Sequence, residues 1–354
     1  MLLHPFSKRK AVMKKFACAV IVLMLLLSSC KEQVKEKFTA YYFDYFDTAT
    51  TIVGYADSKE EFDKVCSDIV AELEEYHKLY TIYSKYDGLT NLYSINKSKG
   101  AVSVDEKIID LLLFSFDAYL LTNGNTNVAM GSVLSLWHDA RTHGEKHPES
   151  AKLPDMDKLI LAAEHTDINN VIIDDDSNTV TFLDGEMSLD VGAVAKGYAV
   201  EAIAKGLEAD GVSGYLLNVG GNVRAVGARA DGTPWTVGIE NPDAKGTDDA
   251  YLAYLSVENE AVVTSGSYQR YYYVDGKAYH HIIDPETLMP GENFRSVSVI
   301  CGSSGIGDAL STALFCMTYE EGRELIESLE DVECMWLFPS GEIKYSSGFE
   351  KYMK

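Results

Sequence analysis

The residues best suited to chemistry lie between Ser188 and Val200, which read Ser-Leu-Asp-Val-Gly-Ala-Val-Ala-Lys-Gly-Tyr-Ala-Val. A strand-like apolar run precedes them, Asp190 and Gly192 break it, and an alanine-rich segment with helical spacing continues to about Leu207. A strand, a turn and a helix start commonly hold an anion, because the first N–H groups of a helix have no partner within it. Asp190 is itself an anion, so the stretch suits a polar ring or a phosphate bridged by a metal. A metal would require a second acid.

Asp308 and Thr312 are candidates for that second acid and for an accompanying hydroxyl. They stand four residues apart at the start of a short helix predicted from Asp308 to Met317, and would lie on one helix face. Carboxylate and hydroxyl oxygens suit Mg²⁺, which usually shares its coordination shell with substrate phosphates and water. The simpler alternative is an acid that favours a helix N-terminus, next to a threonine bonded to its own backbone.

Two histidines stand in the segment Tyr279-His-His-Ile-Ile-Asp-Pro285. Neighbouring residues of a strand point to opposite faces, so His280 and His281 are not expected to share a metal. One of them could act as a general base near neutral pH, and the alternative is a histidine hydrogen-bonded at a strand end. The sequence lacks the glycine motifs typical of dinucleotide-binding folds, P-loops and serine hydrolases.

The elements that must position these residues mix strands and helices irregularly. Helical spacing predicts an apolar helix from Met130 and further helices over 60–80, 105–122, 156–163 and 319–329. Alternating apolar residues and turn residues predict a strand or hairpin over 41–55 and hairpins over 171–183 and 268–283. Residues 138–154 are predicted to form an exposed loop, and residues 302–307 a flexible turn. The hairpins favour an α+β fold with antiparallel or mixed sheets and packed helices over a doubly wound parallel sheet.

The first thirty residues read as an export signal. Five basic residues precede an unbroken apolar run over 16–27, which is too short to span a bilayer as a helix. The run ends in Leu27-Ser-Ser-Cys30, which resembles the lipobox of bacterial lipoproteins, where the cysteine thiol is acylated. We therefore expect a signal peptide over 1–29, a lipidated Cys30 with a tether over 30–39, and one domain over 40–354. The protein would be exported and anchored by lipid to the outer face of the cell membrane, on the periplasmic side where an outer membrane exists.

Composition narrows the set of partners. The 354-residue chain has a net charge of −23, and removing the five basic residues of the export signal leaves −28. So acidic a protein is not expected to bind nucleic acid or anionic lipid, and its membrane link would be the lipid alone. Four further cysteines show no metal or redox spacing and are predicted to be buried free thiols: Cys66, Cys301, Cys316 and Cys334.

Taken together and in order, the motifs resemble the ApbE family of FAD:protein FMN transferases. The resemblance covers about residues 40–340 and is carried by Phe46-Asp-Thr48, Asp190-Val-Gly-Ala-Val-Ala-Lys-Gly197, Asn218-Val-Gly-Gly-Asn222, Trp235 with Gly238 and Pro242, Thr264-Ser-Gly266, His281-Ile-Ile-Asp-Pro285 and Asp308-Ala-Leu-Ser-Thr312. It implies an ApbE-like fold with FAD in a central cleft. It also implies an Mg²⁺-dependent enzyme that transfers the FMN half of FAD to a threonine hydroxyl of an exported redox protein and releases AMP.

The family pattern implies a role for individual residues. On that pattern Asp308, Thr312 and the Ala193 carbonyl hold the metal, and His281 is the base that deprotonates the threonine, so His281 and Asp308 are the catalytic pair. The implied flavin contacts are Phe46, Tyr86, Asn125, Thr126, Asn127, Asp190, Lys196 and Ile282. With a metal at Asp308, Asp190 is left to hydrogen-bond a neutral part of the flavin nucleotide.

Two places depart from the family pattern. The family often has Gly-Ala-Phe-Asp where this chain has Gly124-Asn-Thr-Asn127, and often has Asp where this chain has Asn222. Both changes keep hydrogen-bonding shape and remove charge. Two other functions are compatible with the sequence: hydrolysis of FAD to FMN and AMP, and non-catalytic flavin binding by a lipoprotein. The retained pair of Asp308 and Thr312 weighs against the last.

Overall fold

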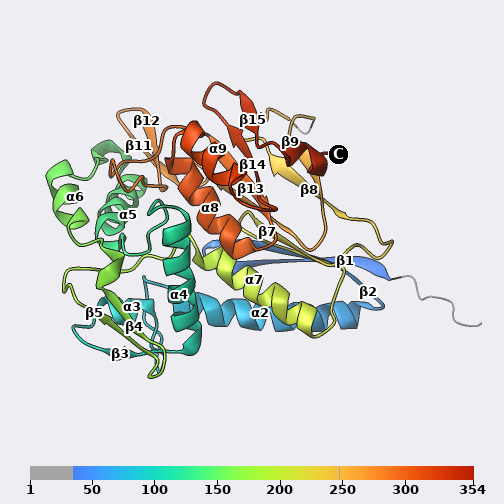
Figure 1. The fold of residues 1–354 in the computed structure, drawn as a ribbon, viewed down its shortest axis with the longest axis horizontal. Helices are drawn as coiled ribbons and strands as arrows, with labels where there is room; N and C mark the ends of the chain where they lie inside the picture. The colour runs from blue at the N-terminus through green and yellow to red at the C-terminus, as the bar shows by residue number, and fades with distance from the viewer. Residues whose placement is uncertain (1–34, 247) are drawn as a thin grey trace, which may run out of the picture.

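An eight-stranded antiparallel sheet lies at the centre of the computed structural model, which describes residues 35–246 and 248–354 (Figure 1). The strand order is β1-β2-β6-β7-β10-β13-β14-β15. The strands run over Glu36–Tyr45 (β1), Thr48–Ala56 (β2), Tyr215–Val219 (β6), Asn222–Val226 (β7), Ala261–Gly266 (β10), Ser296–Cys301 (β13), Glu333–Leu337 (β14) and Ile343–Tyr345 (β15). The sheet and its helices confirm the predicted α+β class.

Three helices pack on one face of this sheet: α2 (Lys59–Tyr80), α7 (Ala195–Ala209) and α8 (Ser304–Cys316). The buried side of α2 repeats every three or four residues, which is the spacing of one helix face: Phe62, Cys66, Ile69, Leu73, Tyr76 and Leu79. α7 and α8 instead meet through small residues. A Cβ on Gly197 would lie 2.3 Å from the Ser304 carbonyl oxygen, so the two helices approach this closely only with glycine there.

The opposite face of the sheet is covered by a two-stranded sheet of β8 (Trp235–Glu240) and β9 (Tyr251–Val257), together with the short 3₁₀ helix η3 (Phe349–Tyr352). Trp235, Val237 and Ile239 alternate with exposed residues along β8 and are buried. This second layer covers part of the face only. It leaves the outer side of β1, β2 and β6 half-exposed.

Another helix, α9 (Tyr319–Glu327), packs on β14. The remaining elements lie toward one end of the sheet: α3 (Leu92–Asn96), β3 (Val102–Ser103), α4 (Glu106–Leu121), α5 (Gly131–Lys146), η1 (Pro148–Ser150), α6 (Met156–Ala163), η2 (Ile168–Asn170), β4 (Val171–Asp174), β5 (Thr179–Phe182), β11 (Tyr271–Val274) and β12 (Lys277–His280). The hairpin β11–β12 packs on α5, and both share a small core that includes Trp137 and Tyr272.

Three boundaries differ from the predictions. β1 begins at Glu36, inside the segment predicted as tether, because alternating residues pair with β2 from that point. The predicted exposed loop over 138–154 is wrong in its first part, since α5 continues through Lys146. The predicted turn over 302–307 is wrong as well, because α8 already begins at Ser304, capped by the Ser303 hydroxyl. The signal peptide, Cys30 and the first residues of the tether lie outside the described residues.

The burial of the cysteines agrees with the prediction made from the sequence. Cys66, Cys301, Cys316 and Cys334 are buried free thiols, as predicted. None of the helices in residues 35–246 and 248–354 is long and apolar enough to cross a membrane.

A buried ion pair joins α7 to the sheet and to α8. Arg224 on β7 donates to Glu201 on α7 over 3.0 Å, and Glu201 also accepts from the Ser304 backbone N–H over 2.7 Å. Both side chains are almost fully buried, so the Glu201 charge depends on Arg224, while Arg224 has a second carboxylate partner in Glu208 at 3.1 Å. The start of α8 is therefore fixed relative to α7 by a carboxylate.

We expect Arg224→Ala to lower the free energy of unfolding by about 3–5 kcal/mol, because it leaves the Glu201 carboxylate buried without its partner. The double variant Arg224→Met with Glu201→Gln should lose less, since both charges are removed together. Urea unfolding followed by circular dichroism measures both. Arg229→Ala, which breaks the exposed pair with Asp231, is the control and should leave the free energy of unfolding nearly unchanged. A double variant as unstable as Arg224→Ala would contradict this account.

Candidate active site

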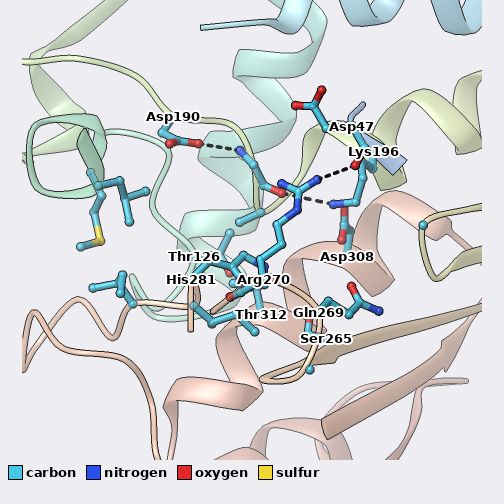
Figure 2. Close-up of a pocket in the computed structure, with 18 of the residues that line it drawn as sticks. Asp47, Thr126, Asp190, Lys196, Ser265, Gln269, Arg270, His281, Asp308 and Thr312 are labelled. Atoms are coloured by element: carbon cyan, nitrogen blue, oxygen red, sulfur yellow. Dashed lines mark hydrogen bonds and ion pairs between the residues drawn. The ribbon is translucent and has the colours of Figure 1, made fainter. Parts of the chain in front are cut away.

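A cavity of about 400 Å³ opens where one end of the main sheet meets α5, α7 and α8 (Figure 2). The start of β2, the β6–β7 turn and the end of β10 lie at this end, because these neighbouring strands are antiparallel. Segments far apart in sequence complete the wall: the α4–α5 connection, the residues before α7, the residues after β12, and the middle of α8. A smaller cavity of about 100 Å³ adjoins it beside the β1–β2 turn.

Asp308 is the most deeply buried acid of the cavity wall, with 4% of its surface exposed. Its carboxylate accepts from the Gly197 N–H over 2.8 Å and from the Asn222 amide over 3.4 Å, and the Lys196 ammonium lies 3.9 Å away. Burial raises the pKa of this carboxyl, while Lys196 and the two hydrogen bonds oppose the rise. Asp308 lies in the second turn of α8 rather than at its start, so the simple preference of acids for helix N-termini does not explain it.

Two further oxygens accompany Asp308. Gly197 lies in the first turn of α7, where backbone N–H groups have no partner within the helix, and its N–H donates to Asp308. Ala193 and Thr312 both line the cavity, and neither the Ala193 carbonyl nor the Thr312 hydroxyl has a hydrogen-bond partner within the part of the chain that the structure describes. One carboxylate, one carbonyl and one hydroxyl suit a hard cation such as Mg²⁺. No group of three or more histidine, cysteine or acidic residues suited to a metal occurs among the described residues.

Asp190 belongs to a chain of polar contacts that the sequence did not reveal. One carboxylate oxygen accepts from the Gly192 N–H over 2.9 Å, and the other lies 3.5 Å from His138 Nε2. The second ring nitrogen of His138 lies 3.4 Å from the Tyr83 hydroxyl. Burial lowers the pKa of His138, although the Asp190 charge opposes this. The N–H groups expected to bind an anion are thus partly used by the protein itself, Gly192 by Asp190 and Gly197 by Asp308.

His281 lies in the cavity wall, whereas His280 points elsewhere and contacts the Gly291 carbonyl over 2.8 Å. His281 Nδ1 lies 3.3 Å from the Arg270 carbonyl oxygen. A carbonyl oxygen only accepts, so the neutral ring must carry its proton on Nδ1 and leave the Nε2 lone pair free. The ring is half-exposed but closely surrounded by protein. Burial and the nearby Arg270 and Lys196 charges lower the pKa of His281 to about 3.

Arg270 holds a strained turn against the cavity. Phe46 and Asp47 connect β1 to β2 with φ values of 53° and 51°, a region that bulky residues rarely adopt. The Arg270 guanidinium donates to the carbonyls of both residues, over 3.3 and 3.1 Å, and the Phe46 N–H donates to His77 over 3.2 Å. Figure 2 shows Arg270 crossing toward Asp47 above the middle of the cavity. Strain of this kind is often found where a backbone is shaped for a ligand.

The predicted site residues fall into three groups. The first lines the main cavity: Asn125, Thr126, Asn127, Asp190, Ala193, Lys196, His281, Ile282, Asp308 and Thr312. Phe46 lines the smaller cavity instead. Tyr86 lines neither of the two; its hydroxyl lies 3.5 Å from His77 Nε2.

Two of the lining side chains are engaged by the scaffold. The Thr126 hydroxyl donates to the Ala309 carbonyl over 2.7 Å, which ties the α4–α5 connection to α8. The Asn127 amide donates to the Thr166 carbonyl over 2.9 Å and its oxygen accepts from the Ala129 N–H. These two side chains therefore shape the cavity wall, and their polar atoms are already paired.

Four titratable residues of the cavity wall were not predicted: Tyr83, His138, Arg141 and Arg270. The available signal was the spacing of Leu134, His138 and Arg141, which places them on one face of a helix that continues past Trp137. With Lys196, the two arginines give three cations, facing the carboxylates of Asp47, Asp190 and Asp308. The cavity is thus suited to a ligand with both anionic and neutral polar parts.

Comparison with known proteins identifies the relatives of this chain. The ApbE family model matches residues 46–336. An FAD:protein FMN transferase from Treponema pallidum is 32% identical over 273 residues, 73% of each chain, and one from Klebsiella pneumoniae is 30% identical over 288 residues, 80% of this chain and 85% of the other. Among solved structures, the ApbE protein of Thermotoga maritima is 27% identical with a TM-score of 0.78, covering 90% of this chain and 100% of the other. The flavin transferase ApbE of Vibrio cholerae is 25% identical with a TM-score of 0.72, covering 90% and 99%.

From the surroundings of His281 we predict that its ring stays neutral at moderately acidic pH. Its folded-state pKa lies below the ordinary value of about 6.5, so the stability contributed by the neutral ring is complete above pH 6.5 and is lost as the pH falls. Side-chain ¹H–¹⁵N spectra between pH 4 and about 8 should show His281 neutral and protonated on Nδ1 down to at least about pH 5. His281→Asn assigns the signals by removing them. A midpoint near 6.5 in the free protein would contradict this environment.

Proposed function

The chain belongs to the ApbE family, and we propose that it is an Mg²⁺-dependent FAD:protein FMN transferase that acts on a threonine hydroxyl and releases AMP. The observation that supports this most is the convergence of Asp308, Lys196 and His281 in one cavity. The buried carboxylate and the free Ala193 and Thr312 oxygens can hold a metal, and the ammonium can meet a phosphate. His281 presents an unprotonated nitrogen to the same space.

The reaction balances with these groups. The threonine oxygen attacks the phosphorus atom of the FMN half, the anhydride bond to the AMP phosphate breaks, and a phosphoester joins FMN to the acceptor. His281 Nε2 takes the hydroxyl proton, and AMP leaves with the bridging oxygen. Bound Mg²⁺ would neutralise charge on the diphosphate, which is much of what phosphoryl-type transfer requires. The protein holds the attacking threonine oxygen and the departing bridging oxygen in place, and it supplies the base that accepts the proton.

The remaining cavity residues suit the rest of FAD. Lys196, Arg141 and Arg270 provide cations for the diphosphate. The chain of Asp190, His138 and Tyr83 can bond neutral polar groups of the nucleotide, since Asp190 already has its own partners. Phe46, in the smaller cavity, offers an aromatic surface next to them.

We further propose that the enzyme is exported and held at the outer face of the cell membrane by a lipid on Cys30, so that its acceptors are exported redox proteins. The basic stretch, short apolar run and Ser-Ser-Cys30 ending support this location. No nucleic acid is expected to bind so acidic a chain.

A transfer assay tests this function. The full chain is incubated with FAD, Mg²⁺ and an envelope extract from a strain of the same bacterium that lacks this gene, which contains the acceptor unmodified. In-gel flavin fluorescence should show a covalently labelled protein, with AMP released in equal amount, and mass spectrometry should locate FMN on a threonine. EDTA should abolish labelling and added Mg²⁺ should restore it.

Two variants test the assigned roles. His281→Asn should lower kcat by about 10²- to 10⁴-fold with FAD affinity retained, because only the proton acceptor is lost. Asp308→Asn should abolish the response to Mg²⁺. His143→Asn, an exposed histidine of α5, is the matched control and should be fully active. AMP and FMN released at full rate without labelling would instead show FAD hydrolysis. Tight FAD binding without turnover, unchanged in Asp308→Ala, would show a non-catalytic flavin-binding protein.

A further inference from the structure

A second groove, of about 600 Å³, adjoins the cavity on the other side of the β6–β7 turn. Four residues line both spaces: Thr48, Gly220, Thr264 and Gln269. Gly220 and Gly221 have φ values of 57° and 93°, and a Cβ on Gly220 would lie 2.3 Å from the Thr48 hydroxyl. The turn between the two spaces therefore carries no side chains that could separate them.

One wall of the groove is a strand edge with free backbone groups. The Tyr254 carbonyl of β9 accepts from the Lys354 N–H over 3.0 Å and so points away from β8. Tyr254 lies opposite Gly238 in the ladder, and Ser256 lies opposite Thr236. The alternation of an antiparallel ladder then directs the N–H and C=O groups of Gly238 and Thr236 to the outer edge of β8. No described residue pairs with them there.

The floor of the groove is the uncovered part of the main sheet. Thr51 and Val53 of β2 and Leu216 of β6 lie half-exposed beside the β8 edge. Glu240, at the end of β8, is the only charged residue among the groove-lining positions. A peptide bound along this edge would meet small and uncharged side chains on its inner side.

We propose that an extended segment of the acceptor protein binds in this groove as an added strand on β8 and carries its threonine past Gly220 into the cavity. The assignment rests on the proposed transferase function, because only a protein substrate requires a second entrance beside the FAD site. A free strand edge binds backbone of many sequences, and the pockets beside it select alternate side chains. The segment should therefore have small, uncharged residues on the side that faces Thr51 and Val53.

The test uses two changes in the groove that leave the residues of the cavity intact. Thr236→Pro removes an N–H that points away from β9, so it blocks strand addition without breaking the β8–β9 ladder; Thr236→Ala keeps the N–H and is its control. Thr51→Trp fills the groove floor. Tyr41→Trp is its control, because Tyr41 pairs with Thr51, is 65% exposed and lies outside the groove. FAD affinity and transfer to the envelope extract are measured for all four in the full chain.

Thr236→Pro and Thr51→Trp should each slow transfer at limiting acceptor by about tenfold, since the first loses a main-chain hydrogen bond to the added strand and the second loses the groove itself. FAD affinity should be unchanged, and both controls should act as the unmodified chain does. Equal transfer by all variants would overturn the groove assignment and leave the proposed function standing. An altered oligomeric state, or an equal loss of FAD affinity, would assign the groove to a second copy or to FAD and would also overturn it. No transfer by the unmodified chain would overturn both proposals.

Discussion

The buried carboxylate of Asp308 is the constraint on which the site depends. A charge with so little exposure requires partners, and the protein supplies the Gly197 N–H, the Asn222 amide and the Lys196 ammonium. To reach Asp308, Gly197 must lie against α8 without a side chain, which brings the start of α7 onto the middle of α8. Ala193 precedes α7 and lines the same cavity, and its carbonyl has no hydrogen-bond partner among the described residues. One interaction thus sets the helix crossing beside oxygens suited to a cation.

Asn222 and Asn127, the two amides at positions where the resemblance implies carboxylates in other family members, fit this setting. Asn222 donates to Asp308, and an aspartate there would place a second negative charge beside a carboxylate whose burial is already costly. Asn127 donates to the Thr166 carbonyl, a bond that a carboxylate cannot make. In both places the missing charge is exchanged for a donated hydrogen bond. The chain thereby keeps its cavity shape with less negative charge near the expected diphosphate.

Sequence patterns predicted the elements better than they predicted the cavity wall. The spacing of Phe62, Ile69 and Leu73 is a local pattern, so the sequence alone predicts α2, and it predicts the hairpins in the same way. Tyr83 and Arg270 reach the cavity only because separate loops converge at one end of an antiparallel sheet, and no local pattern records that. The polar residues after His138 predict a loop there, although its spacing from Leu134 continues the helix. Most of the site residues that the family resemblance implied line the main cavity. Phe46 lines the adjoining cavity instead, and Tyr86 lines neither of the two.

Arg270 joins two properties that usually belong to different parts of an enzyme. Its side chain holds the strained Phe46–Asp47 turn, and its own carbonyl fixes the tautomer of His281. Movement of the turn would shift the Arg270 backbone, and with it the atom that decides which ring nitrogen is basic. Through Arg270, the shape of the β1–β2 hairpin is therefore linked to which ring nitrogen of His281 carries the proton. A loop movement at the edge of the sheet could thus turn a proton acceptor on or off without touching the histidine.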